Sequence, residues 1–178
     1  MAGDSISQGY DTHTPSRSFA NLIAWKMNAI CLNQAVGGDV YDVRNFDAMP
    51  DYSPDLGIIA FGTNDWSGRK DVRTNADLYL KRFAELYPGV PAYVVTPIWR
   101  IDEGVVREET GLTVGDVREI IRETALRYGF RPVDGLPLVP NDPAWYSDGE
   151  LHPNDQGHIC YAQGLTNILR GEHPEFFD

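Results

Sequence analysis

Two polar side chains that are far apart in the sequence could together form a covalent catalyst. Ser5 lies in the segment GDSISQG, residues 3–9, where glycines at both ends favour a turn that exposes the hydroxyl. A serine hydroxyl is a poor nucleophile until a base removes its proton. His152 lies among carboxylates in the segment DGELHPN, residues 148–154, and histidine is a common base near neutral pH. Taken alone, the first segment favours the plainer explanation, a turn that Asp4 or Ser5 merely caps.

Two further segments contain groups that could stabilise the anion formed during acyl transfer. Gly37 and Gly38 follow one apolar run, and Asn64, within the segment GTND, follows another. Glycines let backbone amides approach a substrate closely, and an asparagine side chain adds a further donor to an oxyanion. The plainer alternatives are turn chemistry for the glycines and an Asx turn for Asn64. The four segments make one site only if the fold brings them together.

Helices and strands that alternate along the chain must position these segments. Apolar spacing predicts helices at about 16–28, 71–87, 113–128 and 155–170, and apolar runs predict strands at 29–36, 56–61, 92–97 and within 131–139. Thr113 and Asp116 predict a capping box at the start of the third helix. This alternation implies a parallel sheet covered on both faces, with the ligand site at the carboxyl ends of the strands. We therefore expect a three-layer α/β sandwich.

The four polar segments, in this order and across nearly the whole chain, resemble the four sequence blocks of the SGNH (GDSL-type) hydrolase family. Each block alone is a weak signal, but four in order are specific. The resemblance implies an SGNH-hydrolase-like (flavodoxin-like) α/β/α fold with a central parallel sheet. It also implies that Ser5 is the nucleophile and His152 the base. By the same resemblance, Gly38, Asn64 and the backbone amide of Ser5 form the oxyanion hole.

The acid that would orient His152 departs from the family pattern. Family members place this acid three residues before the histidine, and here that position is Gly149. Asp148 lies four residues before His152 and needs a bulge of one residue, whereas Glu150 lies two residues before it. We expect Asp148 to be the acid, with Glu150 or a serine–histidine dyad without an acid as the alternatives.

The length of 178 residues suits a single domain spanning 1–178. In the resembled family, the GDS turn directly follows a first β-strand at the centre of the sheet, yet only Met1 and Ala2 precede Gly3 here. A vacant central position would leave buried amides and carbonyls unpaired, at ~1 to 3 kcal/mol each. We therefore expect that the first strand is missing from the given sequence and that the domain is the C-terminal catalytic part of a longer protein.

Composition and charge argue against several kinds of partner. The 15 basic and 26 acidic residues give a net charge of −11, which disfavours nucleic acid and anionic membranes. The apolar runs are far shorter than the ~20 residues that span a bilayer. Metal-ligand spacings and glycine-rich nucleotide motifs do not occur, so we expect no metal and no cofactor. The given sequence begins without a signal peptide, so the default expectation is a cytoplasmic protein, or a secreted one if the N-terminus is truncated.

The expected substrate is a small-molecule or carbohydrate ester, cleaved by a serine esterase specific for short, acetyl-type acyl groups. Flat aromatic walls suit sugar rings, although loop packing is the plainer explanation for exposed tryptophans. The expected substrate-binding residues are Asp4, Trp66, Trp99, Arg100 and Trp145. A thioesterase or lysophospholipase would use the same triad, and a carbohydrate-binding module with an impaired triad is a non-enzymatic alternative.

Overall fold

The computed structural model describes residues 1–46, 52–68 and 71–177 and has a parallel β-sheet at its centre. The strands are β1 (Ala2–Gly3), β2 (Gly57–Ala60), β3 (Ala92–Val95) and β4 (Arg131–Val133). They lie in the order β1-β2-β3-β4, and every neighbouring pair is parallel. The carboxyl ends of all four strands therefore meet at one edge of the sheet.

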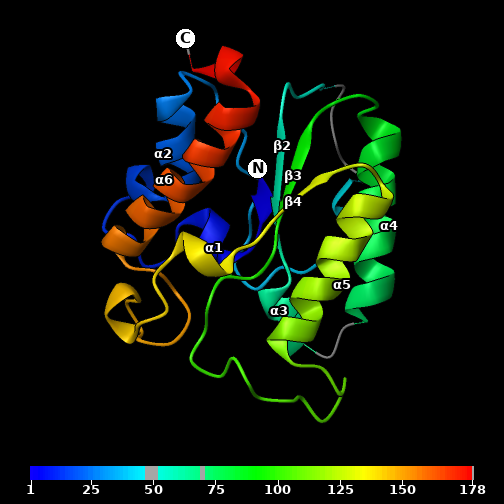
Figure 1. The fold of residues 1–178 in the computed structure, drawn as a ribbon, viewed down its shortest axis with the longest axis vertical. Coiled ribbons are helices and arrows are strands. Elements are labelled where there is room, and N and C mark those ends of the chain that lie inside the picture. The colour runs from blue at the N-terminus through cyan, green and yellow to red at the C-terminus, as the bar shows by residue number, and fades with distance from the viewer. Residues whose placement is uncertain (47–51, 69–70, 178) are drawn as a thin grey trace.

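Helices cover both faces of this sheet, as Figure 1 shows. They are α1 (Ser5–Gln8), α2 (Phe19–Lys26), α3 (Thr63–Ser67), α4 (Val72–Leu86), α5 (Val114–Arg127) and α6 (Asp155–Glu172). The pair α2 and α6 packs on one face, and the pair α4 and α5 packs on the other. This arrangement confirms the predicted three-layer α/β/α sandwich. No helix in the described ranges is long and apolar enough to cross a membrane.

Side chains of the strands point alternately into two apolar cores. Ile59 and Val94 belong to the core formed with α4 and α5, whereas Ile58, Tyr93 and Val95 belong to the core formed with α2 and α6. All five side chains are buried. Successive residues of a strand face opposite sides, so a sheet covered on both faces needs uninterrupted apolar runs. This explains why short apolar runs located β2 and β3 correctly.

Local capping chemistry sets where the helices begin. At α5, Asp116 N donates to Thr113 Oγ1 over 3.1 Å and Thr113 N donates to Asp116 Oδ2 over 2.8 Å, which confirms the predicted capping box. The helix predicted at 16–28 begins later than expected. Ser18 caps α2, and the residues before it form a separate 3₁₀ turn, Pro15–Arg17.

The strand predicted at 29–36 was wrong. Three backbone hydrogen bonds join this segment to residues 1–3: from Gln34 N to Met1 O over 2.9 Å, from Val36 N to Gly3 O over 3.2 Å and from Met1 N to Leu32 O over 3.0 Å. A strand needs a partner along its length, and β1 consists of two residues. Residues 29–36 therefore lie beside the sheet without forming a further strand of it.

The expectation of a missing first strand is corrected for two residues, Ala2 and Gly3, while the expectation that the domain belongs to a longer protein stays a prediction. Ala2 pairs with Ile59 and Gly3 pairs with Ala60, so β1 fills the position between β2 and the segment 29–36. At the amino ends of β1 and β2, a cavity of about 440 Å³ opens between the two helix layers. Apolar residues that line it include Met1, Ile23, Ala24, Ile58 and Phe83. The carboxyl end of β1 is thus built into the sheet, while its amino end borders a cavity.

Candidate active site

The turn between β1 and α1 places Ser5 at the carboxyl edge of the sheet. Asp4 Oδ1 accepts a hydrogen bond from Ile6 N over 3.0 Å and caps the helix. Gly9 ends α1 with φ of 89°, in the left-handed region that favours glycine. Because Asp4 provides the cap, the half-buried hydroxyl of Ser5 is available for another partner.

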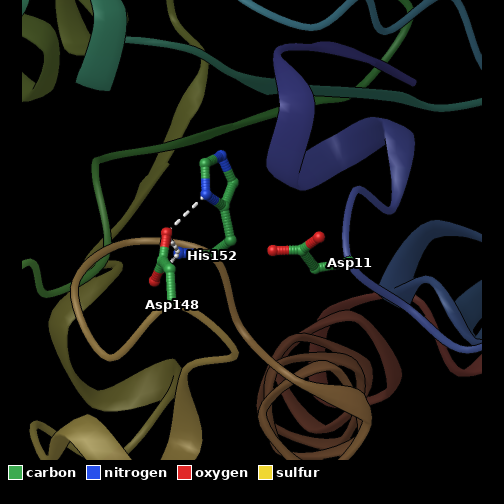
Figure 2. A group of neighbouring side chains, drawn as sticks. All are labelled: Asp11, Asp148 and His152. Carbon is green, nitrogen blue, oxygen red and sulfur yellow. Dashed lines mark hydrogen bonds and ion pairs between the residues drawn. The ribbon is translucent and has the colours of Figure 1, made fainter.

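That partner is His152, which is 147 residues away in the sequence. Ser5 Oγ lies 3.1 Å from His152 Nε2, and His152 Nδ1 lies 2.7 Å from Asp148 Oδ2, the contact drawn in Figure 2. Because Asp148 is ionised, Nδ1 carries the ring proton and donates a hydrogen bond to the carboxylate. Nε2 is then the acceptor for the Ser5 hydroxyl. The three side chains form the array that a serine nucleophile requires.

Backbone amides that follow Asp148 keep its carboxyl group ionised. Asp148 Oδ1 accepts hydrogen bonds from the amides of Glu150 at 2.9 Å, Leu151 at 2.8 Å and His152 at 3.1 Å. Burial alone would raise the pKa of Asp148, but these amides and the His152 side chain outweigh burial and lower the pKa to about 2. Asp148 is therefore a carboxylate at neutral pH.

The tight turn after Asp148 accommodates the position of the acid four residues before the histidine. Gly149 has φ of 71°, and its amide donates to Tyr146 O over 3.2 Å. The left-handed residue lets the chain fold back so that Asp148 reaches the ring of His152. Glu150, the alternative acid, is exposed. Of the two carboxyl groups, Asp148 has the contacts that an orienting acid needs.

Hydrogen bonds connect the expected oxyanion donors to the turn that carries Ser5. Gly38 has φ of 80°, and its turn closes through a bond of 3.0 Å from Asp39 N to Val36 O. Asn64 Nδ2 donates to Asp39 O over 3.0 Å, which joins the start of α3 to the same turn. Val36 N in turn donates to Gly3 O of β1, directly before the turn that carries Ser5. The sheet edge thus assembles the segments of Ser5, Gly38 and Asn64.

Two buried aspartates lie beneath this edge. Asp4 is 3% exposed and Asp65 is 0% exposed, and Asp65 Oδ1 accepts a hydrogen bond from Tyr41 N over 3.1 Å. Burial raises the pKa of each carboxyl group to about 7, against the opposing effect of the amides that donate to it. The expectation that Asp4 binds substrate is corrected, because its carboxyl group is buried and caps α1.

Trp66 and Arg100, two of the expected substrate-binding residues, are also buried. Trp66 is 1% exposed, and its Nε1 donates to Leu112 O over 2.9 Å. The guanidinium groups of Arg100 and Arg107 lie over its ring at 4.3 Å and 4.0 Å, and Arg100 pairs with Asp102. The prediction failed because Trp66 lies on the face of α3 that packs inward. A position directly after the segment GTND in the sequence does not determine that face.

The remaining aromatic candidates lie closer to the surface. Trp99 and Trp145 are partly buried against the core, and the Trp99 ring lies 5.0 Å from the Tyr146 ring. Sequence reasoning missed Tyr10, whose ring lies 4.7 Å from the His152 ring and which is 55% exposed. Its position directly after the glycine that ends α1 was the available signal. Tyr10 offers an exposed aromatic surface beside the imidazole.

Asp11 is a second acid near the imidazole that the sequence did not indicate. Ligating atoms of Asp11, Asp148 and His152 all lie within 4.8 Å of one another. Figure 2 shows the three side chains together. These atom types could bind a metal ion. The contacts present are hydrogen bonds, however: Asp148 accepts from backbone amides and from His152, and Asp11 Oδ2 lies 2.6 Å from Ser147 Oγ. The cluster is therefore satisfied as a hydrogen-bonded network.

Comparisons with known proteins agree with this fold. A protein of known structure from Lactobacillus plantarum superposes with a TM-score of 0.79 at 20% identity, over 97% of this chain and 96% of that chain. A carbohydrate acetylesterase family member from Sinorhizobium meliloti has a TM-score of 0.71 at 14% identity, over 95% of each chain. A search of curated proteins found no match.

A third structure with this fold is a two-domain esterase active on acetylated mannans. It superposes with a TM-score of 0.72 at 21% identity, over 96% of this chain and 48% of that chain. The present chain thus spans about half the length of that esterase. The GDSL-like Lipase/Acylhydrolase family matches residues 1–159 of the present sequence, which is most of its length. The chain belongs to this family and is an SGNH-type serine hydrolase.

Proposed function

We propose that this protein hydrolyses short-chain, acetyl-type esters, with acetylated carbohydrates as its substrate class. The observation that carries the proposal is the continuous contact from Ser5 Oγ through His152 to the ionised Asp148. This arrangement suits deprotonation of the hydroxyl as it attacks an acyl carbon. A carbohydrate-binding module would have no use for a serine, a histidine and an acid in mutual contact.

The acylation step uses each of these groups once. Ser5 Oγ forms a bond to the acyl carbon while His152 Nε2 takes the hydroxyl proton. Asp148 stabilises the resulting imidazolium, and the negative oxygen of the tetrahedral intermediate accepts bonds from the amides of Ser5 and Gly38 and from Asn64 Nδ2. The bond to the leaving alcohol then breaks, and the alcohol oxygen receives the proton from Nε2. The product is an acyl-enzyme on Ser5.

Hydrolysis of the acyl-enzyme repeats this chemistry with water. His152 Nε2 removes a proton from the attacking water, whose oxygen bonds to the acyl carbon. Ser5 Oγ leaves and recovers the proton, and the carboxylic acid departs. The same oxyanion donors serve both steps, because the charge develops on the same oxygen.

Two observations favour carbohydrate esters over longer acyl esters. Structures with this fold include an esterase active on acetylated mannans and a carbohydrate acetylesterase family member. The exposed ring of Tyr10 lies beside His152 and provides a flat aromatic surface of the kind that packs against sugar rings. By contrast, the cavity of about 440 Å³ lies at the opposite, amino end of β1, away from Ser5.

Hydrolysis of acetyl, butyryl and octanoyl nitrophenyl esters, followed by a screen of acetylated oligosaccharides for released acetate, tests this proposal. We expect kcat/KM to be greatest for the acetyl ester and to fall as the chain lengthens. Ser5→Ala is the matched blank, because it keeps the cap from Asp4 and removes the nucleophile. A preference for octanoyl esters would instead indicate a thioesterase or lysophospholipase, and activity equal to the blank would indicate a binding module.

A further inference from the structure

Asp11 has an unusual backbone conformation directly after the turn that carries Ser5. Its φ is 65°, in the left-handed region that a residue with a side chain rarely adopts. Such a conformation persists where the surrounding contacts over-determine it. The side chain of Asp11 is therefore held at this place by interactions whose partners identify its role.

These interactions connect Asp11 to the loop that carries His152. Ser147 Oγ lies 2.6 Å from Asp11 Oδ2 and 3.1 Å from His152 O, and Ser147 N donates to His152 O over 2.8 Å. Because the distance to Asp11 is shorter, we assign the hydrogen bond of the Ser147 hydroxyl to Asp11 Oδ2, which accepts it. Ser147 thus links the carboxylate of Asp11 to the backbone of His152. A second connection nearby is the bond of 2.9 Å from His13 N to Asp155 Oδ1.

The imidazole of His152 consequently lies near two carboxylates from different loops. Asp148 accepts the Nδ1–H, whereas Asp11 approaches from the loop after α1, as Figure 2 shows, with its nearest ligating atoms within 4.8 Å of those of His152 and Asp148. A charge at this distance attracts an imidazolium more strongly than a neutral ring. Asp11 would therefore act most strongly when His152 has taken the proton from Ser5.

We propose that Asp11 is a positioning residue that holds the His152 loop against the nucleophile turn and stabilises the imidazolium formed during acyl transfer. Because Asp11 acts through His152, this role rests on the proposed function. Asp11 touches neither Ser5 nor the site of the oxyanion in the contacts described, so its contribution is electrostatic and geometric.

The other ionisable groups around His152 do not duplicate this role. Asp148 is already engaged at Nδ1, and Tyr10 contributes its ring face. From α6, His158 is buried, and burial lowers its pKa to about 4, so it is neutral at the working pH. Asp155, also on α6, forms an ion pair of 2.6 Å with Arg17. Asp11 is the acid near the ring whose removal changes the charge there without breaking the Nδ1 contact.

Two substitutions separate the charge of Asp11 from its hydrogen bond. Asp11→Asn keeps an oxygen that accepts from Ser147 but removes the charge, whereas Ser147→Ala removes the hydrogen bond and keeps the charge. For an exposed charge, we expect Asp11→Asn to lower kcat/KM on the acetyl ester about two- to fivefold at low salt, and less at high salt. We also expect the acid limb of the pH–rate profile to move to lower pH by about 0.5 on the pH scale. Ser147→Ala should lower kcat without moving this limb.

The proposal would be overturned if Asp11→Asn did not move the acid limb of the pH–rate profile at low salt. It would also be overturned if Ser147→Ala moved this limb as far as Asp11→Asn does. Asp11→Gly is the second variant, because glycine accepts the positive φ and keeps the fold if Asn is poorly tolerated. It should move the limb as Asp11→Asn does. Esterase activity that persists in Ser5→Ala would refute the proposed function itself. Loss of this activity in Ser5→Ala, together with unchanged activity and an unmoved limb in the Asp11 variants, would refute only the role of Asp11.

Discussion

The two ends of β1 differ in how they are held in place. At the carboxyl end, directed hydrogen bonds fix the turn that carries Ser5 and the loops around it: Asp4 accepts one from Ile6 N, and Val36 and Asn64 donate the others. At the amino end, β1 borders a cavity of about 440 Å³ that both apolar and polar residues line. Short polar motifs thus position the residues of the candidate site, whereas a cavity borders the other end of β1.

The contacts that position Ser5 belong to the turn after β1 and to the loop that carries His152. The cap of α1 is local to the turn, and the contact between Ser5 and His152 depends on the loop of residues 148–152, which is itself held by Asp148. Packing near the cavity should therefore affect stability much more than activity. Polar substitutions at the carboxyl end should do the reverse.

The largest contrast is expected within the histidine loop. Asp148→Asn should lower kcat by ~10²- to 10⁴-fold, because the ring loses both tautomer control and stabilisation of the imidazolium. Glu150→Gln should change kcat less than about threefold, since its exposed side chain has no such partner. Steady-state kinetics on an acetyl ester measures both. A larger loss for Glu150→Gln would move the role of the acid to Glu150.

Asn64→Ala should have the next largest effect on activity. Loss of one oxyanion donor typically lowers kcat by ~10²- to 10³-fold. The same change also removes the bond from Asn64 Nδ2 to Asp39 O, so KM and Tm should be measured with kcat. A loss of Tm with unchanged kcat would show that Asn64 serves the turn alone.

Filling the cavity should stabilise the amino end of β1 without altering catalysis. Ala24→Leu adds apolar atoms to the cavity lining, and a filled cavity commonly contributes ~0.5 to 2 kcal/mol, or a Tm increase of about 2 to 6 °C. The matched control is Ala162→Leu on α6, which is 1% exposed in a packed core and should lower Tm through overpacking. A lower Tm in both variants would mean that the cavity cannot accept a side chain.

The buried acids Asp4 and Asp65 predict a pH-dependent effect on stability. Both carboxyl groups have a pKa of about 7 in the folded protein, raised by burial from 3.8. Between these values the folded protein retains protons that the unfolded chain releases, so stability falls as pH rises from about 4 through 7. We expect Tm to fall by about 5 °C or more between pH 5 and pH 8, with a shallower slope in Asp65→Asn. Equal slopes would contradict this explanation.

Sequence patterns located the site because its residues belong to short motifs, and they located the buried strands because both faces are apolar. Ser5, His152 and Asp148 lie in such motifs, and the turn at Gly149 brings the acid to the ring despite its shifted position. Sequence patterns failed where the structure of a segment, or the burial of a side chain, depends on the residues that pack against it. Residues 29–36 need a longer β1 to become a strand, and Trp66 is buried by the packing of α3 and two arginines.

Asp11 and Tyr10 escaped sequence reasoning for a related reason. Neither residue belongs to the four polar segments, and each reaches His152 only because the chain turns back after Gly9. Side chains that act through contacts between loops leave no periodic or spaced pattern in the sequence. Their identification requires the tertiary fold.

Covalent labelling with a fluorophosphonate, followed by peptide mass mapping, tests the central claim most directly. Such a probe forms a stable bond only with a serine that a neighbouring base activates. We predict one label per chain, located on Ser5, with labelling abolished in Ser5→Ala and strongly slowed in His152→Ala, while both variants keep the wild-type fold by circular dichroism. A label on another residue, or undiminished labelling of Ser5→Ala, would contradict the assignment of Ser5 as the nucleophile.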